Sequence, residues 1–181
     1  MTATAFLSDG VLNLRPVRRD DLARLAAWRN TPEIRQRTRE WKPLNDDDQE
    51  RWFQRISGPD RRDLMFVVED AAAHEPIGVV GLCYWDALNA TAEISFYIGE
   101  PSARGKGFAK RGLALLITWG FDTMRLERIW AEAYAFNEVS IGLLQTLGFR
   151  EEGRLRLHVF REGKRWDSVM LGLLRQEWRT P

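Results

Sequence analysis

The chain has 181 residues, of which 44% are hydrophobic and 11% aromatic. This composition excludes a disordered protein and suits one folded domain over residues 1–181. A formal net charge of +1 gives no sign of a nucleic-acid or membrane surface, so we expect neither partner. The single cysteine, Cys83, excludes an intramolecular disulfide and argues against a structural zinc site. Without a membrane-spanning stretch or a signal-peptide pattern, the expected compartment is the cytoplasm.

The first half of the chain predicts one strand, helices and then three strands. Val11–Val17 alternates apolar and polar residues as a half-buried strand does. Asp20 is a candidate N-cap for a helix that ends before Pro32, where a short second helix can start. Gln49–Ile56 predicts another helix. The three strands that follow are Leu64–Glu69, Ile77–Trp85 and Ala92–Ile98.

The second half predicts two helices and three more strands. The helices are about Gly107 to Met124 and Glu138–Leu147, and the strands are Arg128–Ala133, Phe149–Arg161 and Arg165–Leu174. The order is β-α-α-β-β-β-α-β-α-β-β. Three adjacent strands suit an antiparallel meander, and the later strand-helix-strand units suit parallel crossovers. We therefore predict an α/β fold with a mixed, mostly antiparallel sheet flanked by helices.

The segment 98–109 (IGEPSARGKGFA) joins the end of a strand to the start of an apolar helix. Gly105 and Gly107 allow a tight turn and the close approach of a ligand, and a helix N-terminus favours a phosphate. Arg104 and Lys106 add positive charge. The spacing is not that of a P-loop, and Lys110 stands where a dinucleotide fingerprint needs a third glycine. Alone, such a motif is more often an ordinary turn than a phosphate site.

Two motifs give the segment a more specific interpretation. Arg104-x-x-Gly107-x-Ala109 resembles the [QR]-x-x-G-x-[GA] pyrophosphate loop of the GNAT superfamily of N-acetyltransferases. Residues 137–149 (NEVSIGLLQTLGF) resemble its second signature, a helix opened by asparagine and ending in Leu-Gly-Phe. The order of elements matches as well, so the resemblance covers Leu12 to Leu174. It implies the GNAT fold and acetyl-CoA as co-substrate. The cofactor-binding residues that it implies are Phe96, Tyr97, Ile98, Arg104, Gly105, Lys106, Gly107, Phe108, Ala109 and Asn137.

Transfer of an acetyl group to an amine needs a base for the amine and benefits from a proton donor at the leaving thiolate. Glu93 is the candidate base, because it is acidic within an apolar strand and shares a face with Ser95 and Tyr97; a solvent-facing glutamate is the alternative. Many superfamily members carry a tyrosine donor where this chain has Leu144. Resemblance to ribosomal-protein acetyltransferases implies that Ser140 hydrogen-bonds the departing sulfur, although a serine here can also simply cap the helix. No metal is expected.

The acceptor is left open by two conflicting similarities. The tail, with Gly148-Phe149-x-x-Glu152-Gly153 and Trp166-Asp167, resembles ribosomal-protein N-terminal acetyltransferases and their polyamine-acetylating relatives. Residues 28–35 (WRNTPEIR) resemble enzymes that acetylate nucleotide-linked amino sugars, and the arginines there could face a diphosphate. We expect a protein or peptide N-terminal amine. An amino-sugar nucleotide, a polyamine and a non-catalytic CoA-binding sensor remain alternatives, and so does a homodimer.

Three further residues carry expectations that the structure can test. His158 lies on a predicted strand, where a lone histidine usually packs. Trp28 and Trp41 belong to the helical insertion that walls the acceptor site in the GNAT fold, so we expect both rings to lie at that wall.

Overall fold

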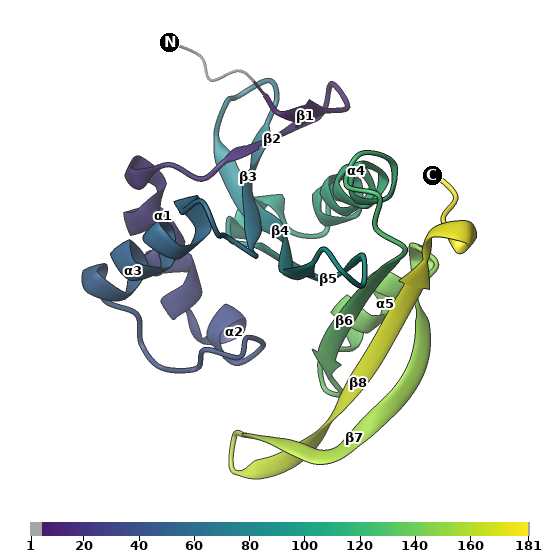
Figure 1. Ribbon diagram of the computed structural model, residues 1–181. Coiled ribbons are helices and arrows are strands. Elements are labelled where there is room, and N and C mark those ends of the chain that lie inside the picture. Colours follow the sequence, from purple (N-terminus) through teal and green to yellow (C-terminus); the bar gives the residue numbers. More distant parts are fainter. Residues whose placement is uncertain (1–4, 181) are drawn as a thin grey trace.

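An eight-stranded sheet lies between two groups of helices in the computed structural model, which describes residues 5–180 (Figure 1). The strand order across the sheet is β1-β2-β3-β4-β5-β6-β8-β7. The strands are β1 (Leu7–Ser8), β2 (Leu12–Pro16), β3 (Leu64–Asp70), β4 (Pro76–Asp86), β5 (Thr91–Ile98), β6 (Arg128–Tyr134), β7 (Arg150–Arg161) and β8 (Lys164–Leu174). The helices are α1 (Leu22–Asn30), α2 (Pro32–Arg35), α3 (Asp46–Ser57), α4 (Phe108–Asp122) and α5 (Glu138–Thr146).

The predicted fold class is confirmed, with three differences in detail. A two-residue strand, β1, pairs with β2 and is too short to show a hydrophobic period. Helix α3 starts at Asp46 instead of Gln49, because the Asn45 side chain accepts a hydrogen bond from the Asp48 N–H (2.9 Å) and caps an acidic first turn. Strand β8 lies between β6 and β7, so the second strand-helix-strand unit does not join neighbouring strands.

Each face of the sheet has its own core. On one face, Leu113, Leu116 and Ile117 of α4 pack with Leu144 of α5 in the larger cluster. On the other, residues of α1 to α3, such as Leu25 and Ile56, form a smaller cluster. The side chains of β5 divide between the two faces by the alternation of a strand. Glu93 therefore shares with Tyr97 the face covered by α1 to α3, as predicted.

Strands β5 and β6 are parallel but stay paired over a short distance only. Their register pairs are Thr91 with Arg128, Ala92 with Ile129, and Glu93 with Trp130. Beyond these pairs, β5 continues beside β4 as far as Ile98, and β6 continues beside β8 as far as Tyr134. The sheet therefore splits into two halves, β1 to β5 and β6 to β8. In the split, backbone groups of β5 and β6 lack each other as hydrogen-bond partners.

Two contacts fix the helices around the split. The Trp28 ring of α1 packs against Gly99, just beyond β5, where a Cβ would come within 2.0 Å of the ring. The β7–β8 hairpin projects from the sheet (Figure 1). From the other side, Arg161 in this hairpin donates hydrogen bonds to the Gln36 (3.3 Å) and Thr38 (3.1 Å) carbonyls. The loop between α2 and α3 is thereby held against the hairpin.

Candidate active site

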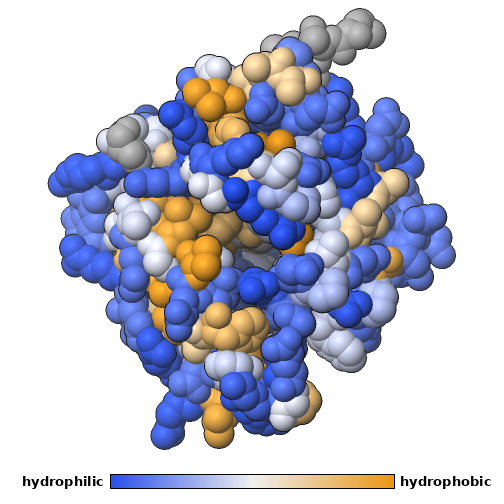
Figure 2. Space-filling view, turned by 180° about the vertical axis from the view of Figure 1, so that it is seen from behind, coloured by the Kyte–Doolittle hydropathy of each residue, from blue (hydrophilic) through white to orange (hydrophobic). Residues whose placement is uncertain are grey.

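A cavity of about 950 Å³ lies between the split strands and the α1 to α3 layer. Ser95, Phe96 and Tyr97 line it from β5, and residues 131–134 line it from β6. The space-filling view shows one face hollowed near its centre, with hydrophobic and hydrophilic residues around the hollow (Figure 2). Of the predicted β5 residues, Ile98 instead packs its side chain against the larger core. The cavity volume is that of a small-molecule site.

Residues 99–107, called the glycine loop below, follow β5 and lead directly into helix α4. Gly105 (φ +74°) and Gly107 (φ +81°) are both left-handed, and apart from the adjacent residues no atom lies within 4 Å of the position that a Cβ would take at either residue. Gly107 is the N-cap of α4, so the free N–H groups of the first turn follow it. This open turn at a helix N-terminus fits a diphosphate.

The side chains of the glycine loop differ in what they can offer a phosphate. Arg104 donates hydrogen bonds to the carbonyls of Ile98 (3.2 Å) and Gly99 (3.1 Å), so it orders the loop from within. Lys106 is exposed, whereas Phe108 packs partly against the larger core and Ala109 is half-buried. The positive charge expected from Arg104 is thus turned toward the backbone, whereas the exposed Lys106 can meet a ligand.

Helix α5 presents two polar groups to the cavity. Asn137 and Ser140 both line it, beside the buried Leu144. Asn137 stands at the N-cap position of α5, but its side chain makes no capping hydrogen bond. Among residues 5–180, the Ser140 hydroxyl likewise has no hydrogen bond that would support the helix-cap alternative. Both groups are therefore available to a bound molecule.

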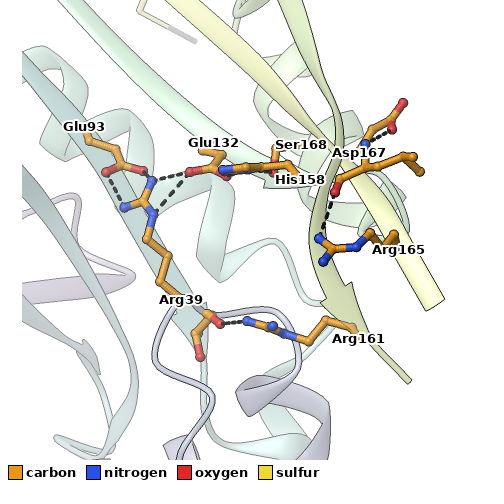
Figure 3. Close-up of polar contacts among 10 residues, drawn as sticks. Arg39, Glu93, Glu132, His158, Arg161, Arg165, Asp167 and Ser168 are labelled. Atoms are coloured by element: carbon orange, nitrogen blue, oxygen red, sulfur yellow. Dashed lines mark hydrogen bonds and ion pairs between the residues drawn. The ribbon is translucent and has the colours of Figure 1, made fainter. Parts of the chain in front are cut away.

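Glu93 lies in the cavity wall, 5% exposed, and is held by an arginine that the sequence did not associate with it (Figure 3). Arg39 donates from both terminal nitrogens to the two Glu93 oxygens, at 2.7 and 2.6 Å. The same guanidinium reaches Glu132 of β6 at 2.7 Å. One cation thus joins two carboxylates from the two strands of the split.

The two carboxylates differ in proton affinity. Burial raises the pKa of Glu93, and the like-charged Glu132 acts in the same direction against the Arg39 guanidinium. Burial also opposes ionisation of Glu132, but the Ser168 hydroxyl and Arg39 outweigh it and hold the Glu132 pKa below its usual range. Glu93 is therefore the more basic of the pair.

His158 contacts Glu132 and so extends the group of polar side chains formed by Arg39, Glu93 and Glu132. It is not the packing residue that we expected. Its Nδ1 lies 2.8 Å from the Ser168 Oγ and 3.2 Å from a Glu132 oxygen, and its side chain is 46% exposed. The sequence showed no sign of this contact, because residues 132, 158 and 168 come together only through the pairing of β6, β7 and β8.

Two predictions about the cavity wall were wrong. The Trp28 ring is buried against Gly99 and Tyr97, and the exposed Trp41 is not among the residues around the cavity. Trp52 of α3 lines the cavity instead. Glu132 was also missed, although an acidic residue within the apolar run 128–134 is the same signal that identified Glu93.

Within residues 5–180 no helix is long and apolar enough to cross a membrane. The same residues contain no group of three or more histidine, cysteine or acidic side chains placed to hold a metal ion.

Known proteins resemble this chain along most of its length. The family model described as an acetyltransferase (GNAT) domain matches residues 12–150. "Uncharacterized N-acetyltransferase p20" of Bacillus licheniformis is 38% identical over 104 residues, 58% of each chain. "Putative ribosomal N-acetyltransferase YdaF" of Bacillus subtilis is 34% identical over 101 residues, 56% of this chain and 55% of the relative. The chain thus spans little more than half the length of these curated relatives.

Among solved structures, the spermidine N-acetyltransferase of Vibrio cholerae in complex with CoA and spermine superimposes with a TM-score of 0.84. It shares 27% sequence identity and covers 93% of this chain and 98% of its own. The family match over residues 12–150 and the split sheet agree, and the chain belongs to the GNAT acetyltransferase family.

Proposed function

We propose that this protein transfers the acetyl group of acetyl-CoA to a primary amine. The observation that carries the proposal is the split between β5 and β6, which ends near an open left-handed glycine turn at the N-terminus of α4. An elongated molecule with a diphosphate at one end suits this combination, since the split offers backbone hydrogen bonds and the turn offers free N–H groups.

Different segments of the chain would bind different parts of acetyl-CoA. The backbone of residues 96–98 would pair with the pantetheine amides, and residues 104–109 would hold the diphosphate, with Asn137 beside the arm. Acetyl-CoA supplies the activated thioester. Because Gly105 and Gly107 carry no Cβ, the diphosphate can approach the backbone there closely.

Two side chains would handle protons and developing charge. Glu93 takes the proton that the amine loses, and its raised pKa makes it a better base than an ordinary glutamate. Ser140 donates a hydrogen bond to the departing sulfur, where a charge-assisted bond is stronger than a neutral one. Leu144 has no proton to give at the same wall, which leaves this contribution to Ser140.

Similarity supports a polyamine acceptor better than the protein N-terminus that the sequence favoured. The structural neighbour is named for spermidine and contains spermine, whereas the ribosomal assignment rests on the name of one relative. The contacts in the cavity weigh against simple transfer of that acceptor, because Glu93 and Glu132 are both already held in ion pairs by Arg39. The proposed acceptor class is therefore a primary amine, with spermidine as the first to assay.

Thermal unfolding with and without acetyl-CoA tests the binding step. A ligand that binds only the native state raises the melting temperature, by an amount that grows with its concentration. Gly107→Asp should abolish the rise, because it brings a Cβ and a negative charge to the turn. Gly163→Asp is the matched control, since Gly163 is equally left-handed (φ +79°) and open but lies in the β7–β8 turn.

Release of free CoA thiol over a panel of amines tests the transfer step. Turnover with at least one amine is expected. A rise in melting temperature without turnover on any amine would favour the sensor alternative, and no rise at millimolar acetyl-CoA would refute the binding step itself.

A further inference from the structure

Arg29 of α1 is half-buried beside the cavity, and among residues 5–180 it has the one buried side-chain nitrogen or oxygen atom that lacks a hydrogen-bond partner. Its Nε is completely buried and has no hydrogen-bond partner within the described chain. A buried donor that gives up water without gaining a partner destabilises the folded protein, and a charged group more so. Unsatisfied buried groups of this kind are rare in native proteins, and one explanation is that a bound ligand supplies the missing hydrogen-bond partner.

The carboxylates around the cavity are already engaged elsewhere. Arg39 binds Glu93 and Glu132, Arg51 binds Asp48, and Arg55 lies 3.4 Å from Asp63. Glu40 accepts a hydrogen bond from the backbone of Lys42 (3.2 Å). Within residues 5–180 none of these five carboxylates pairs with Arg29.

The unpaired charges that remain in the cavity are mostly positive. Arg37 and Lys42 also line it, and in the described chain neither forms an ion pair with a carboxylate. A cationic acceptor would meet Arg29 without a counter-ion to screen it, whereas an anionic group would satisfy the guanidinium.

We propose that the acceptor is an amine that also carries an acidic group, a carboxylate or a phosphate, and that Arg29 binds this group. The inference rests on the proposed acetyl transfer. A guanidinium donates two parallel hydrogen bonds to either oxyanion, which fixes the orientation of the molecule as well as holding it.

Two features place Arg29 on the acceptor side of the cavity. Its companions there include Gln49 and Trp52 of α3, which belong to the helical layer and not to the glycine loop. Tyr97 points to the face of β5 that those helices cover, and its ring packs edge-on against Trp28, the residue before Arg29. Glu93 lies on the same face, so one cavity offers a carboxylate for the amine and a guanidinium for the acid.

Matched pairs of acceptors test the proposal. Glucosamine 6-phosphate is compared with glucosamine, a short peptide with glutamate at its second position is compared with the glutamine peptide, and spermidine is the polycation. The acidic member of at least one pair should show a kcat/KM about tenfold or more above its neutral partner. The phosphate and peptide arms then tell which oxyanion the site prefers.

Variants assign that preference to one residue. Arg29→Gln should remove it, mainly through KM, and Arg29→Lys should restore part of it. Arg24→Gln is the control on the same helix, because Arg24 is exposed, pairs with Glu75 (3.1 Å) and lies outside the cavity. Arg29→Gln should also leave the melting temperature of the free protein unchanged or higher, since it removes an unsatisfied charge.

The contrary outcomes are distinct from failure of the proposed function. Equal kcat/KM within both pairs, spermidine as the best acceptor, or a preference that survives Arg29→Gln would overturn the role of Arg29. A loss of acetyl-CoA affinity in Arg29→Gln would assign the residue to the co-substrate instead. If no amine is acetylated, the role of Arg29 is tested by calorimetric titration of the acidic probes into the CoA-bound protein. Absence of binding would then refute the inference.

Discussion

Cys83 shows how its surroundings set the chemistry of a side chain in the cavity wall. Its Sγ lies 3.6 Å from the Met65 sulfur. Burial, with help from the carboxylates of Asp63 and Glu93, raises the pKa of the thiol to about 12. Because the thiolate is the nucleophile, Cys83 stays inert at neutral pH although it faces the cavity. Acetyl transfer through a covalent cysteine intermediate is therefore not expected, and direct attack of the amine on the thioester is the route that the proposed function predicts.

Ser140 is the residue whose role can be tested most directly. Ser140→Ala should lower kcat by about tenfold while the Kd for acetyl-CoA stays within about twofold, because a hydrogen bond to a developing thiolate acts mainly in the transition state. Steady-state thiol release and calorimetric titration measure the two quantities. Ser140→Thr, which keeps the hydroxyl, should retain most of the activity.

An unchanged kcat in Ser140→Ala would return Ser140 to the role of a helix residue. A parallel fall in acetyl-CoA affinity would make it a binding residue.

At the scale of elements, a buried ion triad anchors the helical layer to the sheet. Arg15 of β2 donates to Asp21, in the turn that precedes α1, and to Glu69 of β3, each at 2.8 Å. All three side chains are at least nine-tenths buried. Because Leu25 and Arg29 of α1 line the cavity, the triad also fixes the position of this part of the cavity wall.

Removal of Arg15 should destabilise the protein strongly. Arg15→Ala removes the arginine that the two buried carboxylates share, and breaking a buried ion pair in this way costs about 3–5 kcal/mol. Urea unfolding at pH 7 measures the loss. The control is Arg24→Ala, which breaks an exposed ion pair and should cost less than about 1 kcal/mol.

The deficit of Arg15→Ala should shrink in acid. In the native protein the pKa values of Asp21 and Glu69 are lowered, by hydrogen bonds from Arg15 that outweigh burial. The stability that these groups contribute is present above their unfolded pKa values, about 3.9 and 4.3, and is lost as pH falls through the lower folded values. A deficit that does not change between pH 7 and pH 3 would contradict this origin.

The sequence predicted the helices and strands that have a clear hydrophobic period, but it could not predict the side-chain contacts that depend on how distant segments pack together. The alternation in β5 predicted which face Glu93 shares with Tyr97, because parity within a strand is a local property. The contact of Arg39 with Glu93 spans 54 residues and depends on an irregular loop, for which no period exists. Roles that rest on family resemblance, such as those of Glu93 and Ser140, remain predictions.

At the scale of the whole molecule, the sheet consists of two halves joined by three register pairs. Helix α4 packs on β2, β4 and β5 of the first half, and α5 follows β6 in the second. A molecule bound in the split would bridge the halves and give the unpaired backbone groups partners.

Hydrogen exchange should reveal this bridging. On addition of CoA, peptides covering residues 94–98 and 105–109 should exchange more slowly, since their amides gain partners and the split closes to solvent. Mass spectrometry measures the change by segment. The β2–β3 pair, far from the split in the strand order, should be unaffected. Slower exchange everywhere but in the split would point to a ligand site elsewhere.

The contact between Trp28 and Gly99 connects the glycine loop with helix α1. The ring touches the first residue of this segment, and Arg29 is the next residue along α1. A shift of that segment when acetyl-CoA binds would move the ring, and with it Arg29. We therefore expect the two binding steps to be coupled, and thermodynamic linkage requires that each ligand then change the affinity for the other by the same factor.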